Sequence, residues 1–431
     1  MPLRLDRRSA DFDELFATFL AAKREVSADV ERATRAIVED VAARGDAALL
    51  EATKKFDRLD LEASALRISA AEIDAAMKAC DAATIDALNF ARQRIETFHR
   101  RQLPKDERFI DPLGVELGWR WSAVEAVGLY VPGGTAAYPS SVLMNAVPAK
   151  VAGVARVVMV VPAPDGKLNP LVLAAAHLSG VAEIYRVGGA QAVAALAYGT
   201  ATIAPVAKIV GPGNAHVAAA KRLVFGKVGI DMIAGPSEVL VIADDTGNAP
   251  WIAADLLAQA EHDTSAQSIL ITDSRKLADE VAHAVESQLS TLPRADIARA
   301  SWNDFGAIIL VKHLTDAIPI ANAIAAEHLE VMTADPETLA AQIRNAGAIF
   351  LGPHTPEAIG DYVGGSNHVL PTARSARFSS GLSVLDFMKR TSILKCGPEQ
   401  LRALGPAAMT LGQAEGLDAH SRSVGLRLNL P

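Results

Sequence analysis

A polar stretch between two apolar segments holds the first residues whose types and spacing could do chemistry. Residues 258–268 read Ala-Gln-Ala-Glu-His-Asp-Thr-Ser-Ala-Gln-Ser, between an Ala/Leu-rich run that predicts a helix (251–257) and a strand-like run (268–272). Gln259 and His262 are three residues apart, so they share one face of the last helical turn if the helix extends that far. A histidine between two acids suits acid–base or metal chemistry, although helix ends also collect solvated charges.

Glu327 and His328 form a second candidate. They lie between a predicted helix (317–326) and a predicted strand (329–332). A carboxylate beside an imidazole suits general acid–base catalysis, because histidine titrates near neutral pH without any perturbation. A solvated charge pair at a helix end explains the same pattern equally well.

Asp361 opens a polar, glycine-containing segment after a predicted strand. With Gln259, His262 and a later histidine, Asp361 would complete a mixed nitrogen and oxygen site of the kind that binds zinc. Glutamine is an uncommon ligand, and no HExxH motif supports the metal. Glu415 and His420 are separated by about 140° on an ideal helix, so the sequence by itself predicts an exposed terminus there.

Three glycine-containing turns follow predicted strands, at 132–134, 188–189 and 211–213. The carboxyl ends of parallel strands gather at one edge of a sheet, where such turns let backbone N–H groups approach a phosphate. Residues 211–214 are not a full dinucleotide fingerprint, since His216 stands where a third glycine would come. Three turns together favour a nucleotide site over turns needed for chain reversal alone. The polar side chains on these turns are those of Tyr130, Gln191 and Asn214.

The order of the predicted elements indicates two α/β units, because short β-branched runs alternate with Ala-rich helical runs. The first hundred residues are helical by pattern, with one helix ending at Gly45 and a second running from 71 to 101. This helical region has no strands of its own, so we expect it to pack on the second α/β unit. Asn248 or Asp245 would cap the helix before Gln259. The predicted strands are 119–131, 156–161, 182–187, 208–210, 230–233, 238–242, 268–272, 307–311, 329–332 and 348–351.

We therefore predict two Rossmann-like, doubly wound α/β domains with a helical N-terminal region and a helical C-terminal tail that contains no further strand. The expected parts are an N-terminal arm (1–25), a discontinuous α/β domain with the catalytic residues (26–129 plus 238–383), an inserted Rossmann-like domain with the glycine turns (130–237), and the tail (384–431).

The composition excludes several classes of protein. The chain has 431 residues, of which 50% are hydrophobic, so it can bury a large core and is not disordered. Its net charge of -8, without a basic block, argues against nucleic acid or an anionic membrane as a partner. Cys80 and Cys396 lack the spacing of a redox or zinc pair, and neither a leader segment nor a membrane span is expected. We expect a cytoplasmic protein.

Taken together, the motifs resemble the histidinol dehydrogenase family from about residue 25 onward. The resemblance implies two successive NAD-linked oxidations, in which L-histidinol is converted through bound L-histidinal to L-histidine with two NAD reduced, the last steps of histidine biosynthesis. It also implies a homodimer in which the tail of each chain reaches the partner's site. The matching motifs are Tyr130-Val-Pro-Gly-Gly-Thr-Ala-Ala-Tyr-Pro-Ser-Ser, Ile184-Tyr-Arg-Val-Gly-Gly-Ala-Gln-Ala, Gly211-Pro-Gly-Asn, Ala234-Gly-Pro-Ser-Glu, Gln259-Ala-Glu-His-Asp, Glu327-His-Leu, Gly365-Ser-Asn-His and Glu415-Gly-Leu-Asp-Ala-His.

The resemblance further implies a role for each matching residue. His328 would take the proton of the alcohol, and Glu327 would activate water to attack the aldehyde, which gives a gem-diol without any cysteine adduct. One zinc ion per subunit would bind substrate without changing its redox state. Its ligands would be Gln259, His262, Asp361 and His420. NAD would contact Tyr130, Gln191 and Asn214. Substrate would contact Ser237, Gln259, His262, His328, Asp361, His368, Glu415 and His420.

Two residues depart from the family pattern. Ala326 stands where proline is expected and would loosen the turn that aims Glu327, while His216 adds a titratable group near the cofactor. Three other functions remain open: a related NAD-dependent dehydrogenase for another alcohol, a zinc hydrolase in which Glu327 activates metal-bound water, and a nucleotide-binding regulator without catalysis. Cofactor dependence and sensitivity to chelation distinguish them.

Overall fold

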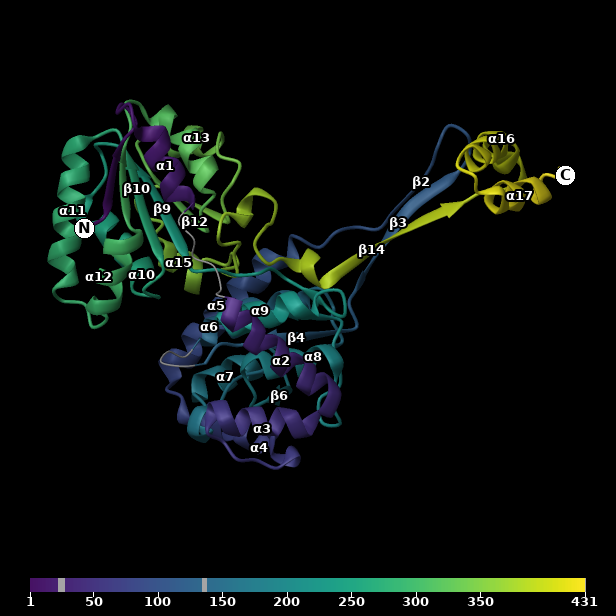
Figure 1. Ribbon diagram of the computed structural model, residues 1–431, viewed down its shortest axis with the longest axis horizontal. Coiled ribbons are helices and arrows are strands. Elements are labelled where there is room, and N and C mark those ends of the chain that lie inside the picture. The colour runs from purple at the N-terminus through teal and green to yellow at the C-terminus, as the bar shows by residue number, and fades with distance from the viewer. Residues whose placement is uncertain (22–27, 134–137, 431) are drawn as a thin grey trace. The chain divides into compact units, whose positions relative to one another are not determined.

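A computed structural model describes residues 1–21, 28–133 and 138–430 of the chain (Figure 1). The chain divides into two compact units. The core unit comprises Met1–Gln102 with Glu125–Phe387, and the tail unit comprises Leu103–Val124 with Met388–Pro431. Among the described residues, none of the helices is both long and apolar enough to cross a membrane.

The core unit contains a five-stranded parallel sheet with the strand order β6-β5-β4-β7-β8. Its central strand is buried along its whole length, as expected for a sheet covered by helices on both faces. The strands are β4 (Ala126–Tyr130), β5 (Arg156–Val160), β6 (Glu183–Tyr185), β7 (Lys208–Val210) and β8 (Gly229–Ile230). Its helices are α6 (Pro139–Val151), α7 (Pro170–Leu178), α8 (Gly189–Tyr198) and α9 (Ala215–Val224).

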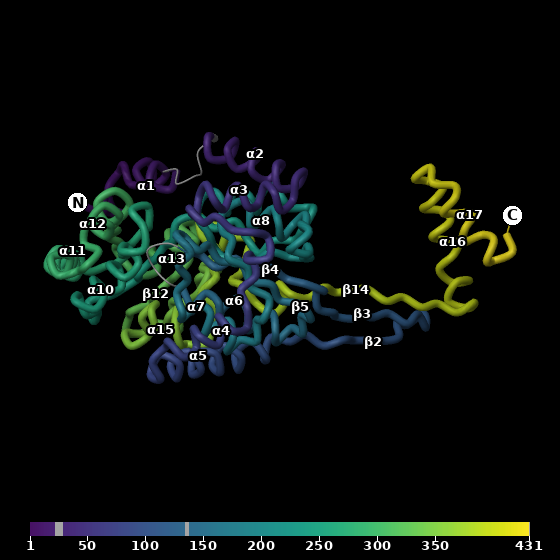
Figure 2. Tube along the Cα trace, turned by 90° about the horizontal axis from the view of Figure 1, so that it is seen from below, coloured from purple at the N-terminus to yellow at the C-terminus, as the bar shows by residue number. Residues whose placement is uncertain are grey.

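The N-terminal helices also belong to this part of the core unit: α2 lies against α8 and α9, α4 against α7, and α5 against α6. Figure 2 shows α2 and α3 beside α8. The expectation that these helices pack on the second α/β unit is wrong, because their apolar faces, with Val41 and Leu49, share a core with Leu196 of α8. The helices are α2 (Ala28–Arg44), α3 (Asp46–Asp57), α4 (Ala70–Ala79) and α5 (Ala82–Arg100).

The long helix predicted over 71–101 is also wrong, because the chain forms two helices there. Cys80 is extended and ends α4. Asp81 then starts α5 as an N-cap, since its carboxylate accepts a hydrogen bond from the Thr84 N–H at 2.9 Å.

A six-stranded parallel sheet forms the other part of the core unit, with the order β1-β11-β10-β9-β12-β13. The first strand is an edge strand within the predicted N-terminal arm, where the sequence analysis expected none. The strands are β1 (Leu3–Asp6), β9 (Glu238–Ala243), β10 (Gln267–Thr272), β11 (Ala307–Leu310), β12 (His328–Met332) and β13 (Ala348–Leu351). The helices are α1 (Phe12–Ala21), α10 (Ala249–Ala260), α11 (Arg275–Leu289), α12 (Ala295–Phe305), α13 (Ala317–Ile324), α14 (Pro336–Ala340) and α15 (Glu357–Tyr362).

The tail unit consists of a three-stranded antiparallel sheet, in the order β14-β3-β2, and two helices that pack on each other. The tail was expected to be helical without a strand, and β14 corrects this. The strand predicted over 119–131 is likewise two strands, because β3 pairs with β14 whereas β4 enters the five-stranded sheet. The elements are β2 (Glu107–Ile110), β3 (Glu116–Ala123), β14 (Met388–Lys395), α16 (Pro398–Ala414) and α17 (Asp418–Arg427).

Candidate active site

The predicted catalytic residues, Glu327 and His328, lie at the amino end of β12 in the six-stranded sheet, beside the amino end of β9. Glu238 is the first residue of β9, and His328 is the first residue of β12, which pairs with β9. Helix α10 follows β9 and returns to this edge of the sheet. Gln259 lies in the last turn of α10, and His262 follows the helix directly. Asn248 caps α10, since its side chain accepts from the Trp251 N–H at 3.1 Å.

The backbone of Glu238 orients His328. The Nδ1–H of His328 donates to the Glu238 carbonyl at 3.2 Å, which leaves Nε2 on the other side of the ring, 3.5 Å from Oδ1 of Asp361. Nδ1 lies 3.8 Å from Oε2 of Glu357 and 3.9 Å from Oε2 of Glu327. His328 is therefore a buried imidazole among three carboxyl groups.

These carboxyl groups determine the charge of His328. Burial by itself lowers the pKa of His328, but the carboxylates of Glu357, Glu327 and Asp361 outweigh burial and raise the pKa well above its ordinary value of 6.5. In the metal-free chain the imidazole is thus the cation that balances its acidic neighbours. The ligand atoms of His328, Glu357 and Asp361 lie within 4.8 Å of one another, which is close enough to hold a metal ion.

Glu327 is fixed by backbone hydrogen bonds. Its Oε2 accepts from the Glu238 N–H at 3.0 Å, and burial raises its pKa to about 7. The preceding turn is closed by Ala325 in the left-handed conformation (φ 50°). The carbonyl of Ala326 then accepts from the Gly347 N–H at 3.0 Å. The turn that aims Glu327 is therefore held by hydrogen bonds with Ala326 in place of the expected proline.

Three acids near this site were not predicted from the sequence: Glu330 and Glu357, which are buried, and Asp255, which is half-buried. Oε1 of Glu330 accepts from the Glu357 N–H at 2.7 Å, and the carboxyl group of Asp255 lies near that of Glu330. Burial and the neighbouring Asp255 raise the pKa of Glu330 to about 9, and burial raises the pKa of Glu357 to about 8 and that of Asp255 to about 6. Spacing offered a signal, because Glu357 and Asp255 each precede a predicted ligand, Asp361 or Gln259, by one helical turn.

Gln259 fits a role as a ligand. It is completely buried, yet neither its Oε1 nor its Nε2 has a hydrogen-bond partner among the described residues. Buried polar groups of this kind are rare in folded proteins and require an explanation, such as an ion that the amide binds. His262 is exposed at the end of α10, and Asp361 is half-buried in α15. Since α10 packs against α15, the structure brings Gln259 and Asp361 to the same region.

The other predicted substrate residues divide between the two units. His368 is joined to the site, because its Nδ1–H donates to the Asp361 carbonyl at 2.9 Å while its Nε2 lies 3.3 Å from Oγ of Ser141. Ser237 is half-buried and directly precedes β9. Glu415, at the end of α16, and His420, in α17, belong to the tail unit and are exposed.

The predicted cofactor residues lie at the carboxyl edge of the five-stranded sheet. Oη of Tyr130, at the end of β4, accepts from the Gly189 N–H at 3.0 Å. Gln191 is buried in the first turn of α8. Asn214 caps α9, where its Oδ1 accepts from the His216 and Val217 N–H groups. The first glycine turn was predicted over 132–134, and its last residue, 134, lies outside the described residues.

His216, the second departure from the family pattern, is held by the helix in front of it. Its Nδ1 lies 3.1 Å from Oγ1 of Thr34 in α2. Its ring is thus engaged by the N-terminal helices.

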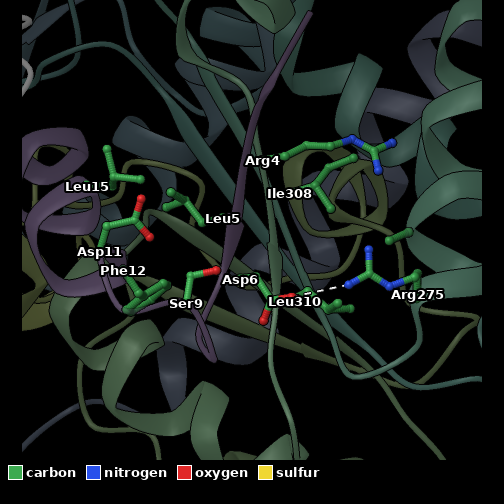
Figure 3. Close-up of a pocket in the computed structure, with 11 residues that line it drawn as sticks. Arg4, Leu5, Asp6, Ser9, Asp11, Phe12, Leu15, Arg275, Ile308 and Leu310 are labelled. Atoms are coloured by element: carbon green, nitrogen blue, oxygen red, sulfur yellow. Dashed lines mark hydrogen bonds and ion pairs between the residues drawn. The ribbon is translucent and has the colours of Figure 1, made fainter.

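A pocket elsewhere in the core unit is lined by residues of β1, β11, α1 and α11 (Figure 3). None of the predicted site residues lines it. Its arginines are already engaged, because Arg4 pairs with Asp279 and Arg275 with Asp6. We therefore place the candidate active site at the amino ends of β9 and β12.

The core unit contains two parallel sheets covered by helices. Glycine turns lie at the carboxyl edge of the five-stranded sheet, and a buried histidine–carboxylate cluster lies at the amino edge of the six-stranded sheet. These features define an α/β protein with a site suited to proton transfer and metal binding. Residues 20–428 match the family described as histidinol dehydrogenase. Relatives named histidinol dehydrogenase from Bradyrhizobium diazoefficiens and Rhodopseudomonas palustris are 85% and 80% identical, and each alignment covers 100% of both chains. A crystal structure of histidinol dehydrogenase from Elizabethkingia anophelis superimposes with a TM-score of 0.94 at 36% identity, covering 99% of this chain and 98% of the other.

The chain belongs to the histidinol dehydrogenase family, a family of oxidoreductases. This outcome confirms the family resemblance and the α/β fold class inferred from the motifs.

Proposed function

We propose that the protein oxidises L-histidinol through bound L-histidinal to L-histidine and reduces two NAD, completing histidine biosynthesis. One observation carries the proposal: the neighbouring residues Glu327 and His328 are both fixed by the backbone of Glu238. The ring of His328 also faces the carboxyl groups of Asp361 and Glu357. Two proton-transfer groups at one point suit an enzyme that must deprotonate an alcohol and then a water molecule.

The donor set fits zinc. We infer that Gln259, His262 and Asp361, together with His420, hold one zinc ion per subunit, and the unpartnered buried amide of Gln259 supports this. Amide oxygen, imidazole and carboxylate are ligands that zinc accepts. When bound, zinc holds and polarises the substrate without changing its own redox state. A divalent cation beside the carboxylates would also replace the proton that they impose on His328.

His328 is then the base of the first oxidation. Because Nδ1–H is bound to the Glu238 carbonyl, Nε2 carries the lone pair that accepts the hydroxyl proton of histidinol. The nicotinamide of NAD, when bound, accepts a hydride in each of the two oxidations. The backbone bond keeps the ring in one orientation, with Nε2 on the side of Asp361.

Glu327 is the base that activates water in the second half of the reaction. Its raised pKa, about 7, places the carboxylate near the pH at which it can take a proton and return it. Attack of water on the aldehyde gives the gem-diol. The gem-diol loses one proton to the protein and a hydride to NAD, which gives the carboxylic acid, and release of a second proton leaves the carboxylate of histidine.

The cofactor is assigned to the inserted domain predicted over 130–237. Tyr130, Gln191 and Asn214 stand at the carboxyl ends of parallel strands, where α/β sheets bind ligands. Asn214 uses Oδ1 to cap α9, so its Nδ2 remains for a ligand.

We further propose a cytoplasmic homodimer in which the tail unit of each chain completes the site of its partner with Glu415 and His420. The tail unit exposes several large apolar side chains, which suit contact with another chain. They are those of Ile110, Leu394, Leu411, Leu417 and Leu426.

The test is the amount of NADH formed per histidinol, with limiting histidinol and excess NAD, before and after chelation. Two NADH per histidinol, lost on chelation and restored by zinc, would support the proposal. Release of histidinal with one NADH would refute the role of Glu327. No reaction with metal present would point to a relative acting on another alcohol, and turnover without NAD would point to a hydrolase.

A further inference from the structure

A buried ion pair lies beside the candidate cofactor turn. Lys221 of α9 and Asp231, the residue after β8, form it, with side chains only 3% and 1% exposed. Removing two charges from water is costly, and a buried pair of this kind does not stabilise a fold as well as apolar side chains would. Its presence therefore needs a reason other than stability.

The pair binds both backbone polar groups of Gly211. Nζ of Lys221 donates to the Gly211 carbonyl at 2.9 Å, and the Gly211 N–H donates to Oδ2 of Asp231 at 2.7 Å. Gly211 has φ +111°, and a Cβ at this position would lie 2.2 Å from the carbonyl oxygen of Tyr130. The residue is thus held from both sides at the point where the chain leaves β7.

Asp231 is itself anchored to the sheet. Its Oδ1 accepts from the Met232 N–H at 2.7 Å, and its own N–H donates to the Ile209 carbonyl at 3.2 Å. Asp231 is consequently fixed to the sheet, and Lys221 reaches it from α9. By holding Gly211, the ion pair determines the position of the residues that follow in the turn, including Asn214.

We propose that Lys221 and Asp231 are positioning residues for the cofactor. They hold the turn 211–214 in one conformation before the dinucleotide arrives, so that binding does not have to order it. An apolar pair would fill the same space, but it would leave the N–H and carbonyl of Gly211 unpaired and the turn free to shift. This inference rests on the proposed function, which assigns NAD to this edge of the sheet.

The experiment uses the double variant Lys221→Met/Asp231→Asn, which removes both charges so that neither remains buried alone. We expect the Kd for NADH, measured by fluorescence titration, and the KM for NAD to rise at least tenfold. The KM for histidinol and the zinc content should stay within twofold of the wild type, because the pair does not contact the substrate site.

A matched control is Arg156→Met/Glu183→Gln. This ion pair joins the amino ends of β5 and β6 in the same sheet, at 2.7 Å, away from the turn. Its loss should lower the unfolding temperature and leave the Kd for NADH within twofold.

A folded double variant with the wild-type Kd for NADH would overturn the proposal. If the double variant does not fold, Lys221→Met alone decides the question by the same Kd, because Asp231 then keeps its hydrogen bonds from the Gly211 and Met232 N–H groups. Absence of NADH binding by the wild-type protein is a different result, because it would refute the assignment of the cofactor.

Discussion

Replacing Gln259 by leucine should make the metal-free protein more stable while weakening zinc binding. The amide is completely buried and has no partner among the described residues, so the folded chain bears its desolvation without compensation. An unsatisfied buried polar group costs about 1–3 kcal/mol, and leucine has a similar volume without polar atoms. The free energy of unfolding of the metal-free variant should rise by about this amount.

The corresponding change in unfolding temperature is small but measurable. An unfolding entropy of about 2.1 cal/mol/K per residue, applied to this chain length, converts 1 kcal/mol into about 1 °C. The metal-free variant should thus unfold about 1–3 °C above the metal-free wild type. Zinc at 100 times its Kd adds about 2.7 kcal/mol to the wild type, hence about 3 °C, and this increase should nearly vanish in Gln259→Leu.

The assay is thermal unfolding in chelator and then in zinc, for both proteins. Gln267→Leu is the matched control, because Gln267 is also buried but its Nε2 donates to the Phe305 carbonyl at 3.2 Å. The control should lose about 1 kcal/mol of stability and keep its response to zinc. Lower stability of metal-free Gln259→Leu, or an unchanged response to zinc, would refute the reasoning.

Three further predictions address catalysis, pH and folding. Glu327→Gln can keep the hydrogen bond from Glu238 but cannot take a proton, so oxidation of added histidinal should fall by about 10²–10⁴-fold in stopped-flow assays while oxidation of histidinol falls less. Equal losses in both steps would contradict the assigned role. The pKa of Glu330 is about 9 in the folded chain, above its ordinary value of 4.5. Between these two pH values the folded chain keeps a proton that the unfolded chain releases, so the free energy of unfolding falls as the pH rises towards 9. In metal-free Glu330→Gln the unfolding temperature should decline less steeply between pH 6 and pH 9 than in the wild type, and an unchanged slope would exclude this source. Asn248→Ala removes the cap of α10 and should cost about 1 kcal/mol in denaturant unfolding, whereas Asn248→Ser, which can also cap, should cost less.

Local sequence was sufficient for most of the α/β elements of the core unit. Helices α7 and α9 begin and end where the pattern predicted, because Ala-rich runs lie between clear caps or breakers. Apart from β1, the strands of both parallel sheets were found from their β-branched, continuously apolar runs. Such signals depend on neighbours within a few residues and need no knowledge of the rest of the fold.

Strands without an apolar signature were not predictable in this way. Strand β14 has no buried residue, and its pairing with β3 is what makes it a strand. Strand β1 is a short edge that exists because β11 offers it hydrogen bonds. The packing of α2 to α5 likewise depends on which apolar surface meets theirs, and periodicity does not specify that partner.

The sequence by itself determined the residue types of the candidate site and the family to which the chain belongs. Only the tertiary structure brought the Nδ1 of His328 to the Glu238 carbonyl. Only the tertiary structure brought Glu357 beside His328, with Glu330 bound to the backbone of Glu357. The physical reason is that burial sets the pKa of these acids and hence whether they are charged. Burial depends on how the sheet and helices pack together and cannot be read from the neighbouring residues in the chain.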